Sequence, residues 1–86
     1  MVLKFEPWGD EPQFDWDEYN QTKLWQHGIR DCEAEECFWN AHSVVPHKKY
    51  RDRYIIRGIT GGGRRLILIV QYKGYNIVRP ITGWDH

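Results

Sequence analysis

Arginines on a β-strand-rich stretch, residues 53–82, are the side chains of this sequence best suited to chemistry. Residues two or four apart in a strand share a face, so Arg53 and Arg57 should point the same way. A guanidinium binds phosphate oxygens bidentately, and tyrosine rings can stack on bases. The pattern predicts a surface for a phosphate-bearing ligand; the alternative is a solvated face whose arginines pair with acids. The further candidate binding residues are Arg64, Arg65, Arg79, Tyr72 and Tyr75.

A lysine and a histidine also have a spacing that could support catalysis. Lys23 and His27 are four apart in a predicted helix and therefore lie on one helix face. Beside RNA, such a pair could hold a phosphate and transfer a proton. The simpler alternative is a histidine at a helix end, where the negative end of the helix dipole favours it.

No other spacing points to catalysis or to a bound cofactor. The sequence lacks a Cys-x-x-Cys pair, a phosphate-binding loop and a nucleophile elbow. His42 and His47 have no convincing third ligand, so no metal site is expected. Cys32 and Cys37 are expected to be reduced, because five residues along a helix place them on different sides.

Charge is divided unevenly along the chain, although the 86 residues have no net charge. Residues 1–41 contain 3 basic and 10 acidic residues, and residues 42–86 contain 9 basic and 2 acidic ones. Such asymmetry indicates either an anionic partner or two halves that neutralise each other within one fold. No apolar run approaches the roughly 20 residues of a membrane helix. The first residues lack a signal-peptide core, so we expect a cytoplasmic protein with no membrane partner.

The C-terminal half predicts a three-stranded antiparallel meander. Strands are expected at residues 54–60, 65–72 and 75–79, with turns at Gly61–Gly63 and Lys73–Gly74. The middle strand is apolar without alternation and should lie centrally. Pro80 is expected to end the third strand, because it cannot donate a hydrogen bond, and residues 83–86 should form a tail.

The N-terminal half predicts two helices, at residues 18–27 and 32–39, joined as a hairpin. Asp17 is the expected N-cap of the first, and Gly28 follows its end. Short strands are expected at residues 2–5, 13–16 and 43–45, and residues 1–12 should form an irregular arm. The sequence therefore predicts one α+β domain, residues 1–86, with two helices packed on an antiparallel sheet.

An ordered set of short motifs resembles the BrnT-type toxin family. The set covers roughly residues 13–85 and comprises Phe14–Asn20, His27–Ile29, Glu33–Phe38, Tyr54–Val70 and Val78–Thr82. The resemblance implies a RelE-like ribonuclease fold that cleaves RNA without a metal. It also implies a cognate antitoxin, often a ribbon-helix-helix protein, in a type II toxin–antitoxin system.

Carried over by position, His27 and Arg79 fall on family-type sites, as do Arg57 and Arg64. The sequence departs from the family at Lys23, where this branch usually has histidine. It also ends at His86, where many members continue. The expected catalytic residues are His27, Lys23, Arg57 and Arg79.

Two functions of different classes follow. In the first, the chain is a ribonuclease toxin in which the substrate 2′-hydroxyl attacks the adjacent phosphate. In the second, it is a non-catalytic module of the same fold that binds a protein partner or forms a homodimer. The second rests on aromatic content, because four of the tryptophans should not all fit so small a core: Trp8, Trp25, Trp39 and Trp84.

Overall fold

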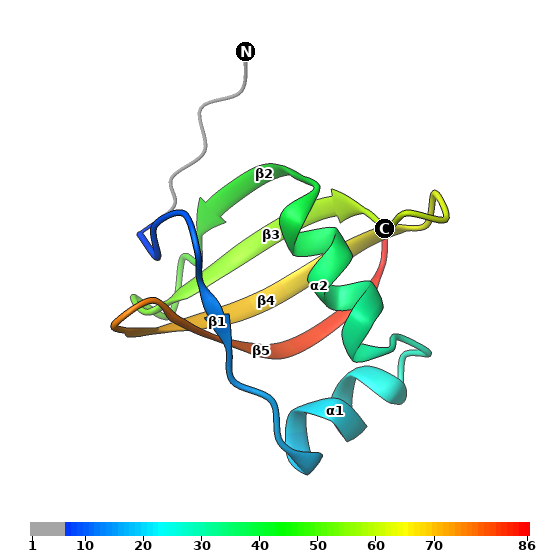
Figure 1. The fold of residues 1–86 in the computed structure, drawn as a ribbon, viewed down its shortest axis with the longest axis horizontal. Coiled ribbons are helices and arrows are strands. Elements are labelled where there is room, and N and C mark those ends of the chain that lie inside the picture. The colour runs from blue at the N-terminus through cyan, green and yellow to red at the C-terminus, as the bar shows by residue number, and fades with distance from the viewer. Residues whose placement is uncertain (1–6) are drawn as a thin grey trace.

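Two helices pack against a five-stranded sheet in the computed structural model, which describes residues 7–86 (Figure 1). This confirms the predicted α+β class. The strand expected at residues 2–5 lies outside the described residues. In chain order the elements are β1 (Gln13–Phe14), α1 (Glu18–Trp25), α2 (Asp31–Trp39), β2 (Ala41–Pro46), β3 (Arg53–Ile59), β4 (Arg65–Gly74) and β5 (Ile77–Asp85).

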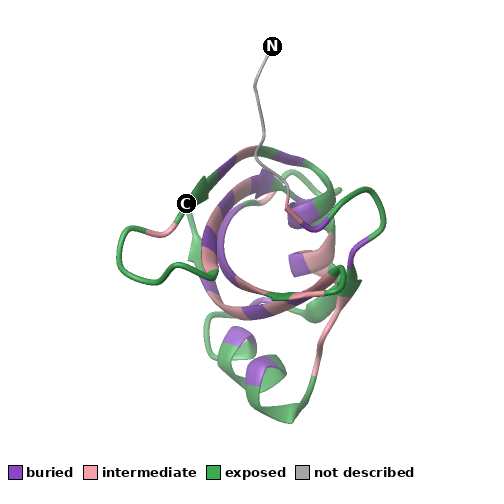
Figure 2. Cartoon of the chain, turned by 90° about the vertical axis from the view of Figure 1, so that its left-hand side faces the viewer, coloured by how far each residue is buried: buried purple, intermediate pink, exposed green. Residues whose placement is uncertain are grey.

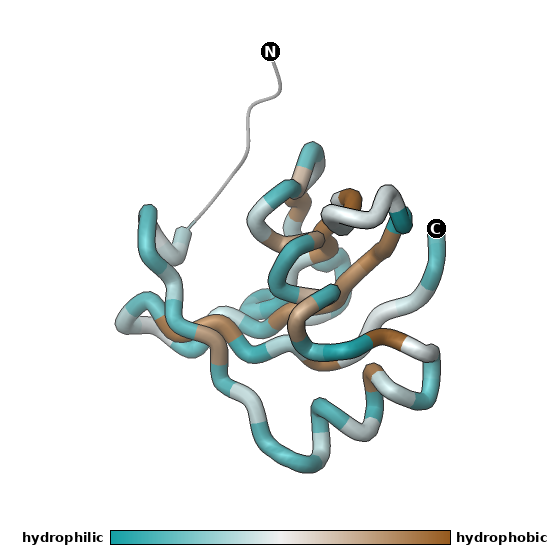
Figure 3. Tube along the Cα trace, turned by 45° about the vertical axis from the view of Figure 1, so that its right-hand side comes forward, coloured by the Kyte–Doolittle hydropathy of each residue, from teal (hydrophilic) through white to brown (hydrophobic). Residues whose placement is uncertain are grey.

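The sheet has the strand order β1-β5-β4-β3-β2. Only β1 and β5 pair in parallel, and the other neighbours are antiparallel. The apolar strand β4 is central, as predicted, and its residues 66–70 are all buried. The hydrophobic stretches of the chain lie along the sheet, while the turns at its ends are hydrophilic (Figure 3).

The sheet curls around α2, so that one face is concave and the other convex (Figure 2). Gly58 of β3 makes the closest approach, since a Cβ there would overlap the carbonyl oxygen of Cys37 in α2. Helix α1 instead runs beyond β5, at the edge of the sheet (Figure 1). A Cβ on Gly83 of β5 would lie 3.1 Å from Leu24 Cδ2 of α1, so this contact also depends on a glycine.

Trp8 fills the concave side together with the aromatic side chains of α2 and β3. Its indole is 2% exposed, and its ring centroid lies 5.1 Å from Phe38 and 5.4 Å from Tyr54. Residues 7–12 contain no helix or strand, as predicted for the arm. The arm nevertheless supplies a core residue, and the tryptophans that stay exposed are Trp25, Trp39 and Trp84.

The last strand and the turn before it differ from the prediction. Strand β4 continues to Gly74, and the turn is formed by Tyr75 and Asn76, with φ of 52° and 63°. Strand β5 continues past Pro80 to Asp85 instead of ending there. The register shifts beside Pro80, and β1 pairs only with residues 77 and 78, so the proline nitrogen occupies a bulge at a free edge.

Helix α1 begins as predicted, with a capping box at Asp17. The Asp17 carboxylate accepts from Asn20 N at 3.0 Å, and Asn20 Oδ1 accepts from Asp17 N at 2.8 Å. The helix ends at Trp25, earlier than the predicted His27, and Gly28 follows with φ of 70°. The buried Asn20 amide also donates to Asp15 O and Pro80 O, both at 2.9 Å, which fastens α1 to β5.

Substitution of Gly58 by alanine should lower the free energy of unfolding by about 1–3 kcal/mol, because the new methyl group overlaps the backbone of α2. Gly62→Ala is the matched control, since its Cβ would meet nothing closer than Thr60 Oγ1 at 3.9 Å. Urea denaturation of both variants and the wild type measures the difference. Equal stability of the two variants would contradict the close packing of α2 on β3.

Candidate functional site

The convex face of the sheet displays Arg79, which lies opposite Gln71 and is described below, and three further predicted arginines. Arg53 and Arg57 of β3 lie opposite Gln71 and Ile67 of β4, and Arg65 lies opposite Ile59. Because paired residues on neighbouring strands share a face, the three guanidinium groups belong to one surface. Within residues 7–86, none of the three forms an ion pair. Their charge is therefore available to an anionic ligand.

An indole joins these arginines on the convex face. Trp84 of β5 pairs with Ile67, which in turn pairs with Arg57, so the three side chains form a row across the sheet. Trp84 is 40% exposed, whereas Ile67 is buried. An exposed indole beside unpaired guanidinium groups is an arrangement on which nucleic-acid bases can stack while phosphates are held nearby.

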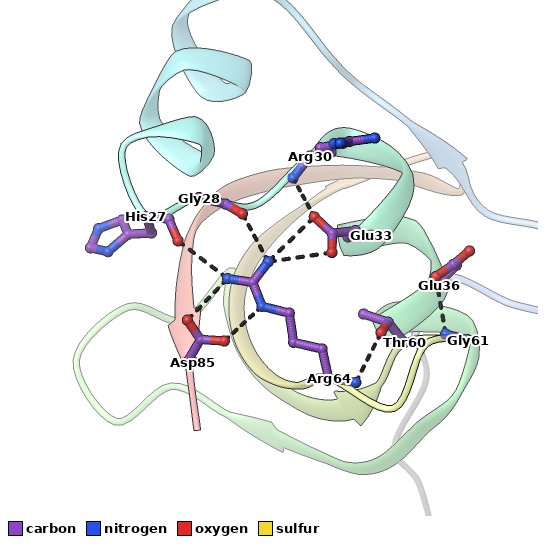
Figure 4. A network of polar contacts seen from close by, with 9 residues as sticks. All are labelled: His27, Gly28, Arg30, Glu33, Glu36, Thr60, Gly61, Arg64 and Asp85. Carbon is purple, nitrogen blue, oxygen red and sulfur yellow. Dashed lines mark hydrogen bonds and ion pairs between the residues drawn. The ribbon is translucent and has the colours of Figure 1, made fainter.

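Arg64 has a different role, because its guanidinium group is bound by carboxylates and carbonyl groups of the protein itself (Figure 4). Its Nε and Nη2 donate to the Asp85 carboxylate at 2.7 and 3.0 Å. Its Nη1 donates to Gly28 O at 2.8 Å and to the Glu33 carboxylate at 3.3 Å, and Nη2 donates to His27 O at 3.4 Å. We call this group, Arg64 with Gly28, Glu33 and Asp85, the Arg64 clasp. It fastens the α1–α2 connection to the end of β5.

Arg79 is also neutralised by neighbouring carboxylates. Its Nη1 lies 3.0 Å from Asp17 Oδ2 and 3.5 Å from Asp15 Oδ2, and Asp15 also binds Lys73 Nζ at 2.8 Å. Hydrogen bonding to Lys73 lowers the pKa of Asp15, and hydrogen bonding to Arg79 lowers the pKa of Asp17. In the Arg64 clasp, the guanidinium lowers the pKa of Asp85 in the same way.

The four expected catalytic residues do not form one cluster. Lys23 lies in the last turn of α1, whereas His27 lies in the turn after the helix, so the two exposed residues do not share a helix face as predicted. Arg79 contacts Asp17 at the opposite end of that helix, ten residues away, which is roughly 15 Å along a helical rise. Arg57 lies on β3, two strands from β5, or about 10 Å across the sheet.

Arg57 and the C-terminal end of α1 lie on different faces of the sheet. The row from Arg57 through Ile67 ends at Trp84, whereas the next residue, Asp85, points to the other face, where the Arg64 clasp holds it. The clasp arginine also donates to the carbonyl of His27. The clasp thereby fixes the backbone of His27 on the side of β5 opposite the convex row.

The two tyrosines of the predicted binding set lie in different environments. Tyr72 faces the core, with its ring centroid 6.1 Å from that of Trp8, and its hydroxyl accepts from Asn76 N at 3.4 Å. Tyr75 occupies the β4–β5 turn and is 94% exposed. Of the two rings, only that of Tyr75 is free to stack on a ligand.

Sequence reasoning missed Trp84 because the third strand was expected to end at Pro80. Thr82 and Trp84 are two apart, and that alternation after the proline is the signal that β5 continues. It also missed the carboxylates Asp15, Asp17 and Asp85 as partners of particular arginines. Their only sequence signal is the opposite charge of the two halves of the chain.

Among residues 7–86, no three histidine, cysteine, aspartate or glutamate side chains gather closely enough to hold a metal ion. The two cysteines are free, with Cys32 exposed and Cys37 buried. Burial raises the pKa of the Cys37 thiol to about 11, so it is not a nucleophilic thiolate at neutral pH. Neither cysteine belongs to the convex face.

Comparisons with protein-family models, with curated proteins and with solved structures find no match to this chain. No helix within the described part of the chain is both long and apolar enough to cross a membrane.

The aspartates that bind Arg64 and Arg79, namely Asp15, Asp17 and Asp85, should make the stability of the protein depend on acid pH. Their pKa values are lower in the folded state, so their contribution is complete above the ordinary aspartate pKa of about 3.9 and is lost as the pH falls through the lowered values. Asp85→Asn should reduce the fall in the free energy of unfolding between neutral pH and pH about 3.

Urea denaturation across this pH range measures that fall. Asp10→Asn makes the same charge change at a residue with no ion pair among residues 7–86, and its pH profile should match that of the wild type. A wild-type profile for Asp85→Asn would show that the Arg64 clasp does not stabilise the fold.

Proposed function

We propose that this chain is a small ribonuclease of the toxin type that binds single-stranded RNA on the convex face of its sheet. The main observation in support of this proposal is that some arginines form ion pairs with carboxylates whereas others do not. Carboxylates occupy Arg64 and Arg79, whereas Arg53, Arg57 and Arg65 share one face without an ion pair among residues 7–86. The resemblance to BrnT-type toxins supports the same class of substrate.

The shape of this surface favours a flexible single strand as its ligand. A convex sheet offers no groove for a folded partner to enter, but a single strand can follow its curvature (Figure 2). The half-exposed Trp84 offers an apolar ring for bases, which stack on aromatic side chains irrespective of their identity. The three guanidinium groups would hold successive phosphates bidentately.

The proposed reaction needs no metal. The 2′-hydroxyl attacks the adjacent phosphorus, the bond to the 5′-oxygen of the next nucleotide breaks, and a 2′,3′-cyclic phosphate forms. The family resemblance assigns the proton transfers to His27 as base and to Lys23 as donor to the leaving oxygen, and the RNA would have to pass around the β5 edge to reach both these residues and the convex face. Arg57 stabilises the charge that develops on the phosphate oxygens. Arg79 would join it only after release from Asp15 and Asp17, so we assign it a supporting part.

A toxin of this kind would act in the cytoplasm, where its RNA substrate is found. A cognate antitoxin, of the ribbon-helix-helix type that the family resemblance implies, would silence it by covering the convex face. Acidic side chains on such a partner would replace RNA phosphates at the three unpaired arginines. No cofactor enters the proposed reaction.

Replacing Arg57 by glutamine should weaken binding of a single-stranded oligoribonucleotide several-fold at low salt, because one phosphate contact is lost. It should also slow RNA cleavage in the presence of EDTA. Fluorescence anisotropy measures binding, and gel analysis of a labelled strand measures cleavage. Arg30→Gln is the matched control, because Arg30 is exposed beside α2 and away from the convex face (Figure 4).

The control variant should bind and cleave as the wild type does. RNA left intact by the wild-type protein, together with unimpaired growth of cells that express it, would exclude the ribonuclease. Binding without cleavage would retain the RNA surface and remove the catalytic assignment of His27 and Lys23.

A second candidate function is a non-catalytic module that binds a protein or forms a homodimer. Exposed aromatic side chains on the two helices favour it: Tyr19 is 71%, Trp25 62% and Trp39 52% exposed. Aromatic residues are enriched at protein interfaces, so each of these exposed rings is a candidate contact residue.

If the helices form a homodimer interface, light scattering after size exclusion should give twice the 10.4 kDa chain mass, and Trp25→Gln should shift the protein towards monomer. Tyr75→Gln is the control, because Tyr75 is more exposed but lies on the β4–β5 turn. A monomeric wild type at high concentration would exclude self-association and leave only a different protein as the partner.

A further inference from the structure

The turn between β2 and β3, residues 47–53, is the most basic segment of the protein. It reads His-Lys-Lys-Tyr-Arg-Asp-Arg, and Asp52 is its only acidic residue. Lys48, Lys49 and Arg51 are exposed and form no ion pair among residues 7–86. We call this segment the basic turn.

Hydrogen bonds give the basic turn a defined shape. The His47 imidazole accepts through Nδ1 from Lys49 N at 3.1 Å and from Tyr50 N at 3.4 Å. Its own backbone N donates to Arg53 O at 2.9 Å, and Arg53 N donates to Tyr50 O at 3.3 Å. The cations are therefore carried on an ordered backbone, which reduces the entropy lost when a ligand binds.

The one carboxylate of the basic turn is directed away from its cations. Asp52 Oδ2 accepts from Gln71 Nε2 at 2.7 Å, and Asp52 O accepts from Tyr72 N at 2.8 Å. Both partners lie on β4, so Asp52 fastens the turn to the sheet. The positive charge of Lys48, Lys49 and Arg51 is left uncompensated as a result.

The basic turn is continuous with the convex face through Arg53. The Arg53 guanidinium lies 4.3 Å from the centroid of the Tyr50 ring, and the centroid of the His47 ring lies 5.3 Å from that of Tyr50. Arg53 and Arg57 are four residues apart on the same strand, which is about 13 Å. A strand of RNA that binds along β3 therefore reaches the turn only when it is longer than the segment held by Arg57 and Arg65.

We propose that the basic turn is a second phosphate-binding subsite, which holds the backbone of single-stranded RNA that extends beyond Arg53. This inference rests on the proposed function of the convex face. It also specifies the path of the RNA on this surface, which runs along β3 from the Arg65 end to the basic turn. The subsite binds the phosphate backbone, so it contributes affinity without base specificity.

Salt dependence of binding tests the subsite. For single strands, each phosphate contact contributes roughly 0.7 to the slope of log K against log salt, so removal of three cations should lower the slope by about 2. The variant is Lys48→Gln/Lys49→Gln/Arg51→Gln, measured with a tetranucleotide and a dodecanucleotide of RNA. The slope should fall for the dodecanucleotide and stay unchanged for the tetranucleotide, which spans only the convex face.

A charge-conserving variant, Lys48→Arg/Lys49→Arg/Arg51→Lys, should keep the wild-type slope. An unchanged slope for the neutral triple variant, with binding still weakened by Arg57→Gln, would overturn the subsite while retaining the RNA surface. No binding of either oligonucleotide by the wild type would overturn both. A slope reduced equally for both lengths would show a general charge effect, and it would also overturn the subsite.

The ordered shape of the turn is tested separately through His47. His47→Ala removes the acceptor of two backbone N–H groups while keeping every cation, and it should weaken dodecanucleotide binding several-fold with an unchanged slope. His47→Asn should restore affinity, because its side-chain oxygen can accept the same hydrogen bonds. Unchanged affinity in His47→Ala would show that preorganisation of the turn contributes nothing.

Discussion

The packing of α2 inside the curl of the sheet is the constraint on which the rest of the structure depends. Gly58 of β3 brings the sheet backbone against the Cys37 carbonyl of α2, so the two elements meet without an intervening side chain. The same curl places Trp8 between α2 and β3 and leaves α1 to lie along β5 (Figures 1 and 2). Because the concave face is filled by α2, the convex face is the one that remains open to a ligand.

The opposite charges of the two chain halves are used in two different ways. Part of the basic half is neutralised within the fold, where Glu33 and Asp85 bind Arg64, and Asp15 and Asp17 bind Arg79. The remaining arginines of the convex face stay unpaired among residues 7–86. Neutralisation between the two halves is thus realised in part, and the unpaired arginines are those that the proposed anionic partner would bind. The acidic residues decide which arginines hold the fold together and which are left for a ligand.

The candidate site is extended rather than compact. Arg57 and Trp84 belong to one row across the convex face, and the basic turn continues the surface along β3. An extended site suits a polymer, in which successive phosphates can occupy separate cations. A small substrate would need its contacts gathered in a pocket. This arrangement is the physical basis for preferring RNA over a small molecule as the ligand.

By itself, the sequence determined the fold class, the central strand, the capped start of α1 and the set of arginines, because periodicity, turn residues and caps act locally. It could not determine the end of β5, since a proline is tolerated wherever a bulge or a free edge makes its missing N–H harmless. Nor could it show which arginines form ion pairs, as Arg64 and Arg79 do, and which do not. That division depends on carboxylates far away in the chain, which only the tertiary structure brings within hydrogen-bonding distance.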